Sequence, residues 1–448
     1  MKLVSLKNII CTGLLLISAS FTSMPALSQA TDNENIMSID TAILFALTNN
    51  PDLNIVNSKD EQAKYAIDEA KSSYYPQVDL SASIGREYNN PAAFKANSEH
   101  SGRGHSNTSN DYSLTVNQLL YDGKSTTSEV KKREQLLNSS EYKNTLVQQK
   151  IILDTINSYM KIYQYHKSMD EAKNLIDQIS KMNKKVALMV DAGAEDLAKS
   201  KYVQSRLSFA KSELTNADAS LSEAVSELEF LTGNIPTFKA KKPDFFDVLS
   251  QDLRGYFKLA SSNNTNLLLN ESDKKATEFE LDKAEGRFLP TLNMVMEYDQ
   301  SIDSGGEIGK DKNASLILQM NYKIFDGYGR KATTNRVEKQ ISESSFKSER
   351  IERDIKKKIK SKYNQIFSLE QELSIIEEEI ITNVDLQKIY QEQFELGEGD
   401  IFRLIEGQER LYRSKVRKYR IETNIIIQSF ELIKQIGFLD KSLFCDVC

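Results

Sequence analysis

Residues 118–127 read QLLYDGKSTT, and residues 322–331 read YKIFDGYGRK. Each stretch begins with alternating residues typical of a β-strand, passes through an aromatic residue, Asp and Gly, and continues into a polar segment with helical spacing. The two stretches therefore predict the same junction, from a strand into a long helix, at two places in one chain.

Landmarks of the first half recur in the second half at two constant offsets, which indicates an internal duplication. The first offset is 214 residues (290 − 76) and the second is 204 residues (327 − 123), so one loop of the first copy is ten residues longer. The polar residues 89–110 fit such a loop. The recurring landmarks are Pro76 with Pro290, Gly123 with Gly327, Gly193 with Gly397, and Gly233 with Gly437.

Each copy contains two segments in which apolar and polar residues alternate, and Pro76 and Pro290 stand at the entry to the first strand of each pair. The alternation predicts β-hairpins at about 76–122 and 290–326. Strands of roughly ten residues with aromatic residues near their ends are typical of transmembrane barrels. A half-buried soluble sheet alternates in the same way, so the strands alone leave both interpretations open.

After each hairpin follows a long segment without Gly or Pro, between Gly123 and Gly193 in the first repeat and between Gly329 and Gly397 in the second. Apolar residues recur at spacings of three and four, which predicts helices over about 124–192 and 330–396, followed by returning helices over about 195–232 and 400–436. A helix of some 65 residues is roughly 100 Å long. The pattern favours a mixed α+β chain with a coiled coil that crosses a wide aqueous gap.

The remaining segments divide the chain. Residues 1–30 have a basic start, a short apolar core and a small-residue cleavage site, which predicts a secretory signal peptide. We expect a first repeat at 31–233, a linker at 234–262, a second repeat at 263–437 and a C-terminal tail at 438–448. Both repeats are expected to begin with a helix.

The long helices end in glycine turns rich in acidic residues. Glycine suits a helix C-terminus, and Asp196 or Asp400 can cap the returning helix. An acidic ring at a pore mouth is the alternative if several copies meet there. The candidate tip residues are Asp191, Gly193, Glu195, Asp196, Glu395, Gly397, Glu398 and Asp400.

Other functional classes find little support. The three histidines have no metal-ligand spacing, and the net charge of −6 gives no support for nucleic-acid binding. Cys445 and Cys448 form a C-x-x-C at the end of the chain, for which a terminal disulfide or free thiols and a redox or metal site are both open. We expect no catalytic residue, no cofactor and no metal.

The strand number then requires several copies. Four strands are too few for a membrane barrel, and an open sheet edge facing lipid leaves backbone groups unpaired. Two chains would supply eight strands and three would supply twelve.

In each repeat the junction residues have separate tasks: the aromatic residue suits the membrane interface, Asp can cap the helix and Gly permits the bend. They are Tyr121, Asp122, Gly123, Phe325, Asp326 and Gly327.

With these features in this order, the chain resembles the TolC-like outer-membrane channels of Gram-negative bacteria. The resemblance implies a homotrimer whose twelve-stranded barrel in outer-membrane lipid continues as an α-helical tunnel into the periplasm. It also implies a periplasmic adaptor protein and an inner-membrane pump as partners. On the same resemblance, residues 232–262, which include the linker or equatorial segment 234–262, would form a small equatorial domain with the C-terminal tail.

Two branches of this family fit differently. Residues 191–198 and 304–311 look more like the outer-membrane components of type I protein secretion, which work with an ABC transporter. The alternative is a multidrug efflux factor serving an RND pump, and a structural envelope coiled coil is a further alternative. Phe394 and Arg403 stand where well-studied members lock the closed entrance with other residues, so Glu395, Glu398, Asp400 and Glu406 are hypothetical replacements.

Overall fold

The computed structural model describes residues 36–89, 105–233, 238–243, 252–305 and 308–439. The chain divides into two units, residues 1–35 and 36–448, and all described residues belong to the second unit. The predicted signal peptide, parts of the linker at 234–262, most of the tail at 438–448, and both Cys445 and Cys448 lie outside the described residues.

The helices confirm the duplication, because each helix of the first repeat has a counterpart of equal length in the second. Helices α1 and α5 have 11 residues, α2 and α6 have 22, α3 and α7 have 67, and α4 and α8 have 36. Among the described residues, no helix is both long and apolar enough to cross a bilayer. The bounds are α1 Ile39–Asn49, α2 Pro51–Ser72, α3 Ser125–Asp191, α4 Leu197–Thr232, α5 Leu253–Asn263, α6 Thr265–Gly286, α7 Gly329–Glu395 and α8 Ile401–Ile436.

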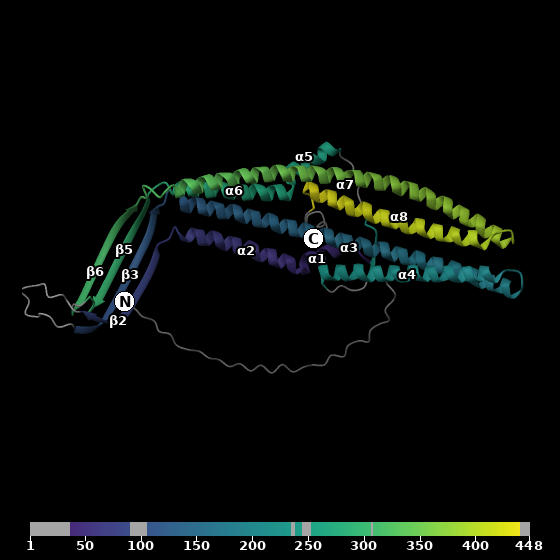
Figure 1. Cartoon of the computed structure of the whole chain (residues 1–448), viewed down its shortest axis with the longest axis horizontal. Helices are drawn as coiled ribbons and strands as arrows, with labels where there is room; N and C mark the ends of the chain where they lie inside the picture. Colours follow the sequence, from purple (N-terminus) through teal and green to yellow (C-terminus); the bar gives the residue numbers. More distant parts are fainter. Residues whose placement is uncertain (1–35, 90–104, 234–237, 244–251, 306–307, 440–448) are drawn as a thin grey trace, which may run out of the picture. The chain divides into compact units, whose positions relative to one another are not determined.

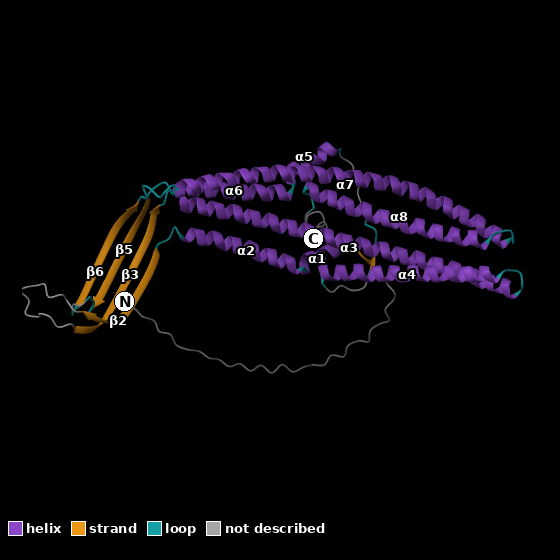
Figure 2. Ribbon diagram, in the orientation of Figure 1, coloured by secondary structure: helices purple, strands orange, loops and turns teal. Residues whose placement is uncertain are grey.

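Four strands form one antiparallel sheet with the order β2-β3-β5-β6 (Figure 2). They are β2 (Gln77–Asn89), β3 (His105–Tyr121), β5 (Thr291–Ile302) and β6 (Lys310–Asn321). The two hairpins have equivalent registers: Gln77 lies opposite Asn117, and Thr291 lies opposite Asn321. The sheet therefore repeats in the same way as the helices, and β2 and β6 are its edges.

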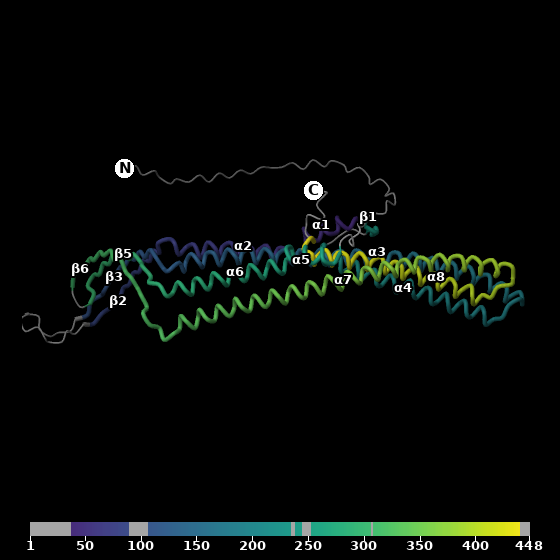
Figure 3. Tube along the Cα trace, turned by 90° about the horizontal axis from the view of Figure 1, so that it is seen from above, coloured from purple at the N-terminus to yellow at the C-terminus, as the bar shows by residue number. Residues whose placement is uncertain are grey.

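The first parts of the helices follow the order of the sheet. Helix α3 packs between α2 and α6, and α6 packs between α3 and α7 (Figures 1 and 3). At the far ends, α3 turns back into α4 and α7 turns back into α8. Each junction between strand and helix is thus separated from its tip turn by one 67-residue helix.

Small residues allow α4 to pack closely along α3. The buried positions of α4 recur every seventh residue, as expected for a coiled coil, and the cluster that includes Val203 and Ala210 also contains Ile179 and Met182 of α3. Apolar burial at this seam contributes roughly 25 cal/mol per Å². The seventh-residue series is Val203, Ala210, Ala217, Ala224 and Leu231.

A buried tyrosine connects α3 to the segment predicted as equatorial. The Tyr159 hydroxyl donates to the Met37 carbonyl oxygen at 2.7 Å and accepts from the Lys241 backbone N–H at 3.0 Å. Its ring stacks on Phe238 with a centroid separation of 6.0 Å. Beside it, β1 (Ile36–Met37) pairs in parallel with β4 (Lys239–Ala240). These contacts hold the linker against the middle of α3.

Candidate functional site: two junctions and two tips

The first junction, between β3 and α3, is closely packed. Asp122 Oδ2 accepts hydrogen bonds of 2.6 Å from the backbone N–H and the Oγ1 hydroxyl of Thr126, so this carboxylate caps the first turn of α3. Gly123 has φ +67°, and a Cβ on it would lie 2.3 Å from the Gly286 carbonyl oxygen. Both the backbone angle and the close contact therefore require glycine at position 123.

The second junction repeats this turn in more open surroundings. Asp326 Oδ2 accepts hydrogen bonds of 3.0 Å from the backbone N–H and from Nε of Arg330. Desolvation acts to raise the pKa of Asp326, but the hydrogen bonds and charge of Arg330 outweigh it and lower that pKa. Gly327 has φ +66°, as expected for the same turn, yet nothing lies within 4 Å of its Cβ position.

The aromatic residues before the two Asp residues are both exposed. Tyr121 is 43% exposed, and Phe325 is 70% exposed. The Phe325 ring lies edge-on to Tyr328 at 5.6 Å. Pro76 and Pro290 each stand one residue before a strand, β2 and β5 respectively.

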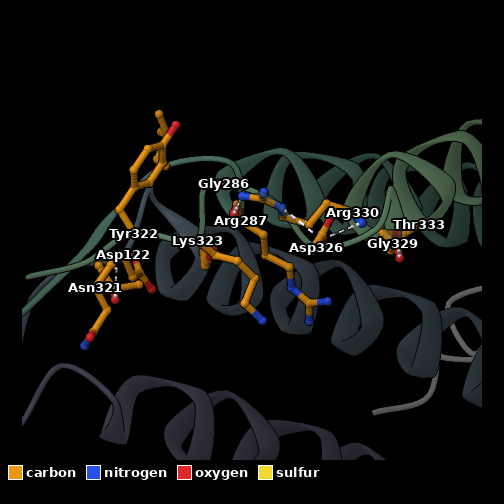
Figure 4. Close-up of a pocket in the computed structure, with 13 residues that line it drawn as sticks. Asp122, Gly286, Arg287, Asn321, Tyr322, Lys323, Asp326, Gly329, Arg330 and Thr333 are labelled. Atoms are coloured by element: carbon orange, nitrogen blue, oxygen red, sulfur yellow. Dashed lines mark hydrogen bonds and ion pairs between the residues drawn. The ribbon is translucent and has the colours of Figure 1, made fainter.

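A cavity of about 780 Å³ lies between the two junctions and is lined by residues of both (Figure 4). Arg330 crosses its wall: the guanidinium donates to the Arg287 carbonyl oxygen at 3.1 Å and lies 5.0 Å from the Phe288 ring. Because Asp326 neutralises Arg330, the pair fixes the position of the junction and is not a free charge.

The tip between α3 and α4 is a glycine turn. Gly193 has φ +72°, and the Ala194 backbone N–H donates to the Met189 carbonyl oxygen at 2.8 Å, which closes the end of α3. Asp196 then caps α4 by accepting a 3.1 Å hydrogen bond from the Ala198 backbone N–H.

The tip between α7 and α8 has the same design. Gly397 has φ +81°, and the backbone N–H groups of Glu398 and Gly399 donate to the Gln393 carbonyl oxygen at 3.0 and 2.9 Å. Asp400 caps α8 through a 3.1 Å hydrogen bond from the Phe402 backbone N–H. The sequence prediction omitted Gly399, where a Cβ would lie 2.6 Å from the Phe394 backbone nitrogen.

The structure brings the two tips together through aromatic and cationic side chains. Tyr202 of α4 and Phe402 of α8 meet edge to face at 4.5 Å. Lys185 of α3 lies over the Phe394 ring at 4.8 Å. A hydrogen bond to Glu195 raises the pKa of Lys199, and the charge of Asp400 on the other tip adds to this.

The acidic tip residues have separate contacts in one chain. Glu195 forms a 2.7 Å ion pair with Lys199, and Glu395 accepts a 2.6 Å hydrogen bond from Gln391. Asp191 and Glu398 are exposed. Among the described residues, no group of three or more His, Cys, Asp or Glu side chains has the arrangement to hold a metal ion. Capping thus accounts for Asp196 and Asp400 in the chain.

Partly buried polar contacts between α8 and the α3–α4 hairpin were not predicted. Lys415 pairs with Glu171 at 2.9 Å, and the Tyr412 hydroxyl lies 3.2 Å from a Glu213 carboxylate oxygen. Burial, with Glu213 next in effect, raises the pKa of Tyr412 strongly. Glu409 is 5% exposed, and its carboxylate lies 3.7 Å from Arg206 of α4 and 3.0 Å from Arg413 of α8 itself. The contacts of Lys415, Tyr412 and Arg206 join α8 to the α3–α4 hairpin near the tips.

Comparison with known proteins gives consistent results. Residues 43–234 match the family model described as outer membrane efflux protein. A Brucella suis protein described as outer membrane efflux protein BepC is 20% identical over 445 residues, which cover 96% of this chain and 90% of that protein.

Solved structures share the fold. The Campylobacter jejuni CmeC outer membrane channel superposes with a TM-score of 0.77 at 14% identity, covering 96% of both chains. The Neisseria gonorrhoeae MtrE outer membrane channel, in its open state, superposes with a TM-score of 0.72 at 13% identity, covering 90% of both chains. These likenesses confirm the predicted combination of a helical tunnel and strands that contribute to a barrel.

Proposed function

We propose, from the premise that the chain belongs to the TolC-like family of outer-membrane channels, that three copies pool their strands into one twelve-stranded barrel. The family and the fold are those of passive channel-tunnels, located in the outer membrane and extending into the periplasm. The observation that carries the proposal is the four-stranded sheet with β2 and β6 as unpaired edges. Unpaired edge strands are not tolerated in the hydrocarbon region of a bilayer, and closing the sheet into a barrel pairs them.

The exposed apolar side chains of the sheet support the same proposal. Leu80 and Ile84 of β2 are each 77% exposed, and Leu318 of β6 is 65% exposed. A row of apolar side chains on one sheet face suits contact with lipid hydrocarbon. The 67-residue helices suit passage across the periplasm, since each is roughly 100 Å long.

The cargo we propose is protein, exported by a type I secretion system with an inner-membrane ABC transporter and a periplasmic adaptor. The tip segment 191–198 and the hairpin loop at 304–311 support this branch by their resemblance to secretion members. The described part of that loop is tied to the first hairpin, because the Gly305 backbone N–H donates to Glu87 at 2.9 Å.

Multidrug efflux with an RND pump is the second candidate. The observation in its favour is that the similar proteins carry efflux in their descriptions. Deletion of the gene, followed by a secreted-protein profile and a drug-sensitivity panel, separates the two. Loss of a large exported protein at unchanged drug tolerance supports secretion. Increased drug sensitivity with an unchanged secreted profile contradicts secretion and supports efflux. Complementation with the intact gene is the control.

We also propose that Glu398 and Asp400 of several copies form an acidic entrance. Glu398→Gln with Asp400→Asn removes the charges, while Asn keeps the cap on α8. The expected result is reduced cation selectivity and weaker block by divalent cations in single-channel recordings, since rings of carboxylates select cations. Unchanged conductance and block would contradict this assignment and leave the channel function standing.

A further inference from the structure

Because the chain is duplicated, the contacts between its two repeats show which contacts the equivalent open surfaces could make. Inside the chain, β3 pairs with β5 and α3 packs on α6, so the first repeat contacts the second through these elements. The repeat counterparts of β3 and α3 are β6 and α7, and those of β5 and α6 are β2 and α2. In one chain, β6 and β2 are edge strands that do not meet.

Strand β6 ends earlier than its repeat counterpart β3. Strand β3 continues to Tyr121, and its last residues pair with β5, as in Gln118 opposite Met294. Strand β6 stops at Asn321, although the counterpart of Tyr121 is Phe325 (121 + 204). Three of the four residues 322–325 correspond to β3 residues that pair with β5, namely Gln118, Leu119 and Tyr121. Strand β6 is an edge of the sheet, so these positions have no strand to pair with inside the chain.

The helices show the same difference. Gly286 of α6 is buried against Gly123, whereas its counterpart on α2, Ser72, is exposed. Because a Cβ at position 286 would lie 2.6 Å from the Gly123 carbonyl oxygen, Ser72 requires a wider spacing from a junction than Gly286 has. Gly327, the counterpart of Gly123, has nothing within 4 Å of its Cβ position. The second junction therefore has the backbone of a packed junction without the element that packs on it.

We infer that β6 and α7 of one copy bind β2 and α2 of a second copy in the register that β3 and α3 use with β5 and α6. The inference rests on the proposed oligomeric channel and specifies which residues meet. The register follows by adding 204 to each β3 residue and subtracting 214 from each β5 residue. Leu114 opposite Tyr298 thus becomes Leu318 opposite Ile84 of the partner subunit.

The sequence is compatible with this register on both faces of the sheet. On the apolar face, Met320 lies opposite Ala82 of the partner subunit, and Leu318 lies opposite the partner's Ile84. On the polar face, Leu119 opposite Asn293 becomes Lys323 opposite Asp79 of the partner subunit. Opposite charges in directly opposing positions stabilise paired strands. A slip of one residue would place polar against apolar faces, and a slip of two would separate Lys323 from the partner's Asp79.

The helices carry two further opposite-charge pairs. The Ser139 hydroxyl donates to Asp273 at 2.6 Å inside the chain, and the counterparts of these residues are Glu343 and Lys59 of the partner subunit. Both Glu343 and Lys59 are exposed in the single chain.

The second pair comes from an ion cluster on the same helices. Lys132 and Lys283 both contact Glu129, at 3.8 and 2.8 Å. The counterpart of Lys132 is Arg336, and the counterpart of Lys283 is Glu69 of the partner subunit. Two like charges inside the chain thus correspond to two opposite charges between chains. Both Arg336 and Glu69 are exposed in the single chain.

Such an interface is heterologous, because each copy offers one face and receives another, and repetition of it closes a ring. Paired cysteines test the register. In a background with Cys445→Ser and Cys448→Ser, Leu318→Cys and Ile84→Cys are combined in one chain. Directly opposed antiparallel residues have Cα atoms about 4.5–5.5 Å apart, within disulfide range. Mild oxidation is expected to convert most chains into a ladder of covalent multimers on a non-reducing gel.

Two control variants define the result. Leu318→Cys with Leu80→Cys is displaced by four residues, roughly 14 Å along the strand, and is expected to give no ladder. Leu114→Cys with Tyr298→Cys is the equivalent pair inside the chain and is expected to close without forming multimers. Coexpressed chains that carry Leu318→Cys alone and Ile84→Cys alone are expected to form covalent dimers but no longer ladder.

The outcomes separate the inference from the proposed function. Native mass spectrometry first establishes whether the membrane-extracted protein is an oligomer. An oligomer without the 318–84 cross-link, or with the displaced cross-link in its place, overturns the inferred register and leaves the channel function intact. A monomer in the outer membrane overturns both.

Discussion

Replacing Gly123 by alanine tests whether the first junction is as tightly packed as the structure indicates. Two effects act on the new Cβ. The positive φ of +67° places alanine in the left-handed region, which costs about 1–2 kcal/mol. The Cβ would also lie 2.3 Å from the Gly286 carbonyl oxygen and 2.9 Å from Leu289 Cβ, and relief of such overpacking costs about 1–3 kcal/mol. The expected total loss of stability is about 2–5 kcal/mol.

Gly193→Ala is the matched control, because Gly193 has φ +72° and nothing lies within 4 Å of its Cβ position. It is expected to lose about 1–2 kcal/mol from the backbone angle alone. Gly286→Ala isolates the other effect: its Cβ would lie 2.6 Å from the Gly123 carbonyl oxygen, and φ there is not positive. Its expected loss is about 1–3 kcal/mol.

The measurement is urea unfolding of the detergent-solubilised protein, followed by circular dichroism at the helix band, with free energies from linear extrapolation. The reasoning predicts that Gly123→Ala unfolds at the lowest urea concentration of the three variants. Equal midpoints for Gly123→Ala and Gly193→Ala would refute the close contact between the junction and the end of α6.

Three other changes have expected outcomes by the same assay. Asp400→Ala removes the cap on α8 and should cost about 1 kcal/mol, whereas Asp400→Asn should be nearly neutral; equal losses would contradict capping. The pKa of the Asp326 carboxyl is lowered, so its stabilising effect is complete above the ordinary value of 3.8 and is lost as the pH falls through the lowered value. The difference in unfolding free energy between the natural chain and Asp326→Asn should therefore shrink on acidification. A difference that stays constant with pH would contradict this. Glu409→Ala leaves Arg206 and Arg413 without their buried partner and should cost about 2–3 kcal/mol of stability. This is less than the loss of a fully buried pair, because both arginines keep access to water. A cost under about 0.5 kcal/mol would show that the two ion pairs contribute little.

The long helices could be predicted closely because their limits are local. Gly and Pro interrupt a helix through backbone effects that act at one position, so their absence from 125–191 and from 330–395 indicates where α3 and α7 begin and end. The predicted 124–192 compares with Ser125–Asp191 in the structure, and the predicted 330–396 compares with Gly329–Glu395. The glycine turns at the tips follow from the same local effects.

The polar contacts near the tips could not be predicted because they depend on which helices become neighbours. Glu171 and Lys415 are 244 residues apart and look like ordinary members of charged helix faces. Only the packing of α8 on α3 brings them together and partly buries them. For Asp196 and Asp400 the sequence left capping and an acidic ring open, since both need a carboxylate beside a glycine turn.

The inferred interface leads to a final prediction about assembly. The α3–α6 contact forms within one chain, where a neutral serine opposite Asp273 is sufficient. The equivalent contact, between α7 of one chain and α2 of another, must form by diffusion. In that contact Glu343 and Lys59 of the partner subunit carry opposite charges, whose attraction accelerates encounter. Screening by salt should therefore slow assembly of the purified chain in detergent, on the order of tenfold between 0.05 and 0.5 M.

Chemical cross-linking at timed intervals measures the assembly rate. A chain with Glu343→Gln and Lys59→Gln should assemble more slowly at low salt and respond less to added salt, because one of the three opposed pairs is gone. Reversal of both charges, Glu343→Lys with Lys59→Glu, should restore the original salt response, since the pair is again opposite in sign. If all three chains assemble at one rate whatever the salt, these helices do not meet through Glu343 and Lys59, and steering by charge plays no part in joining the copies.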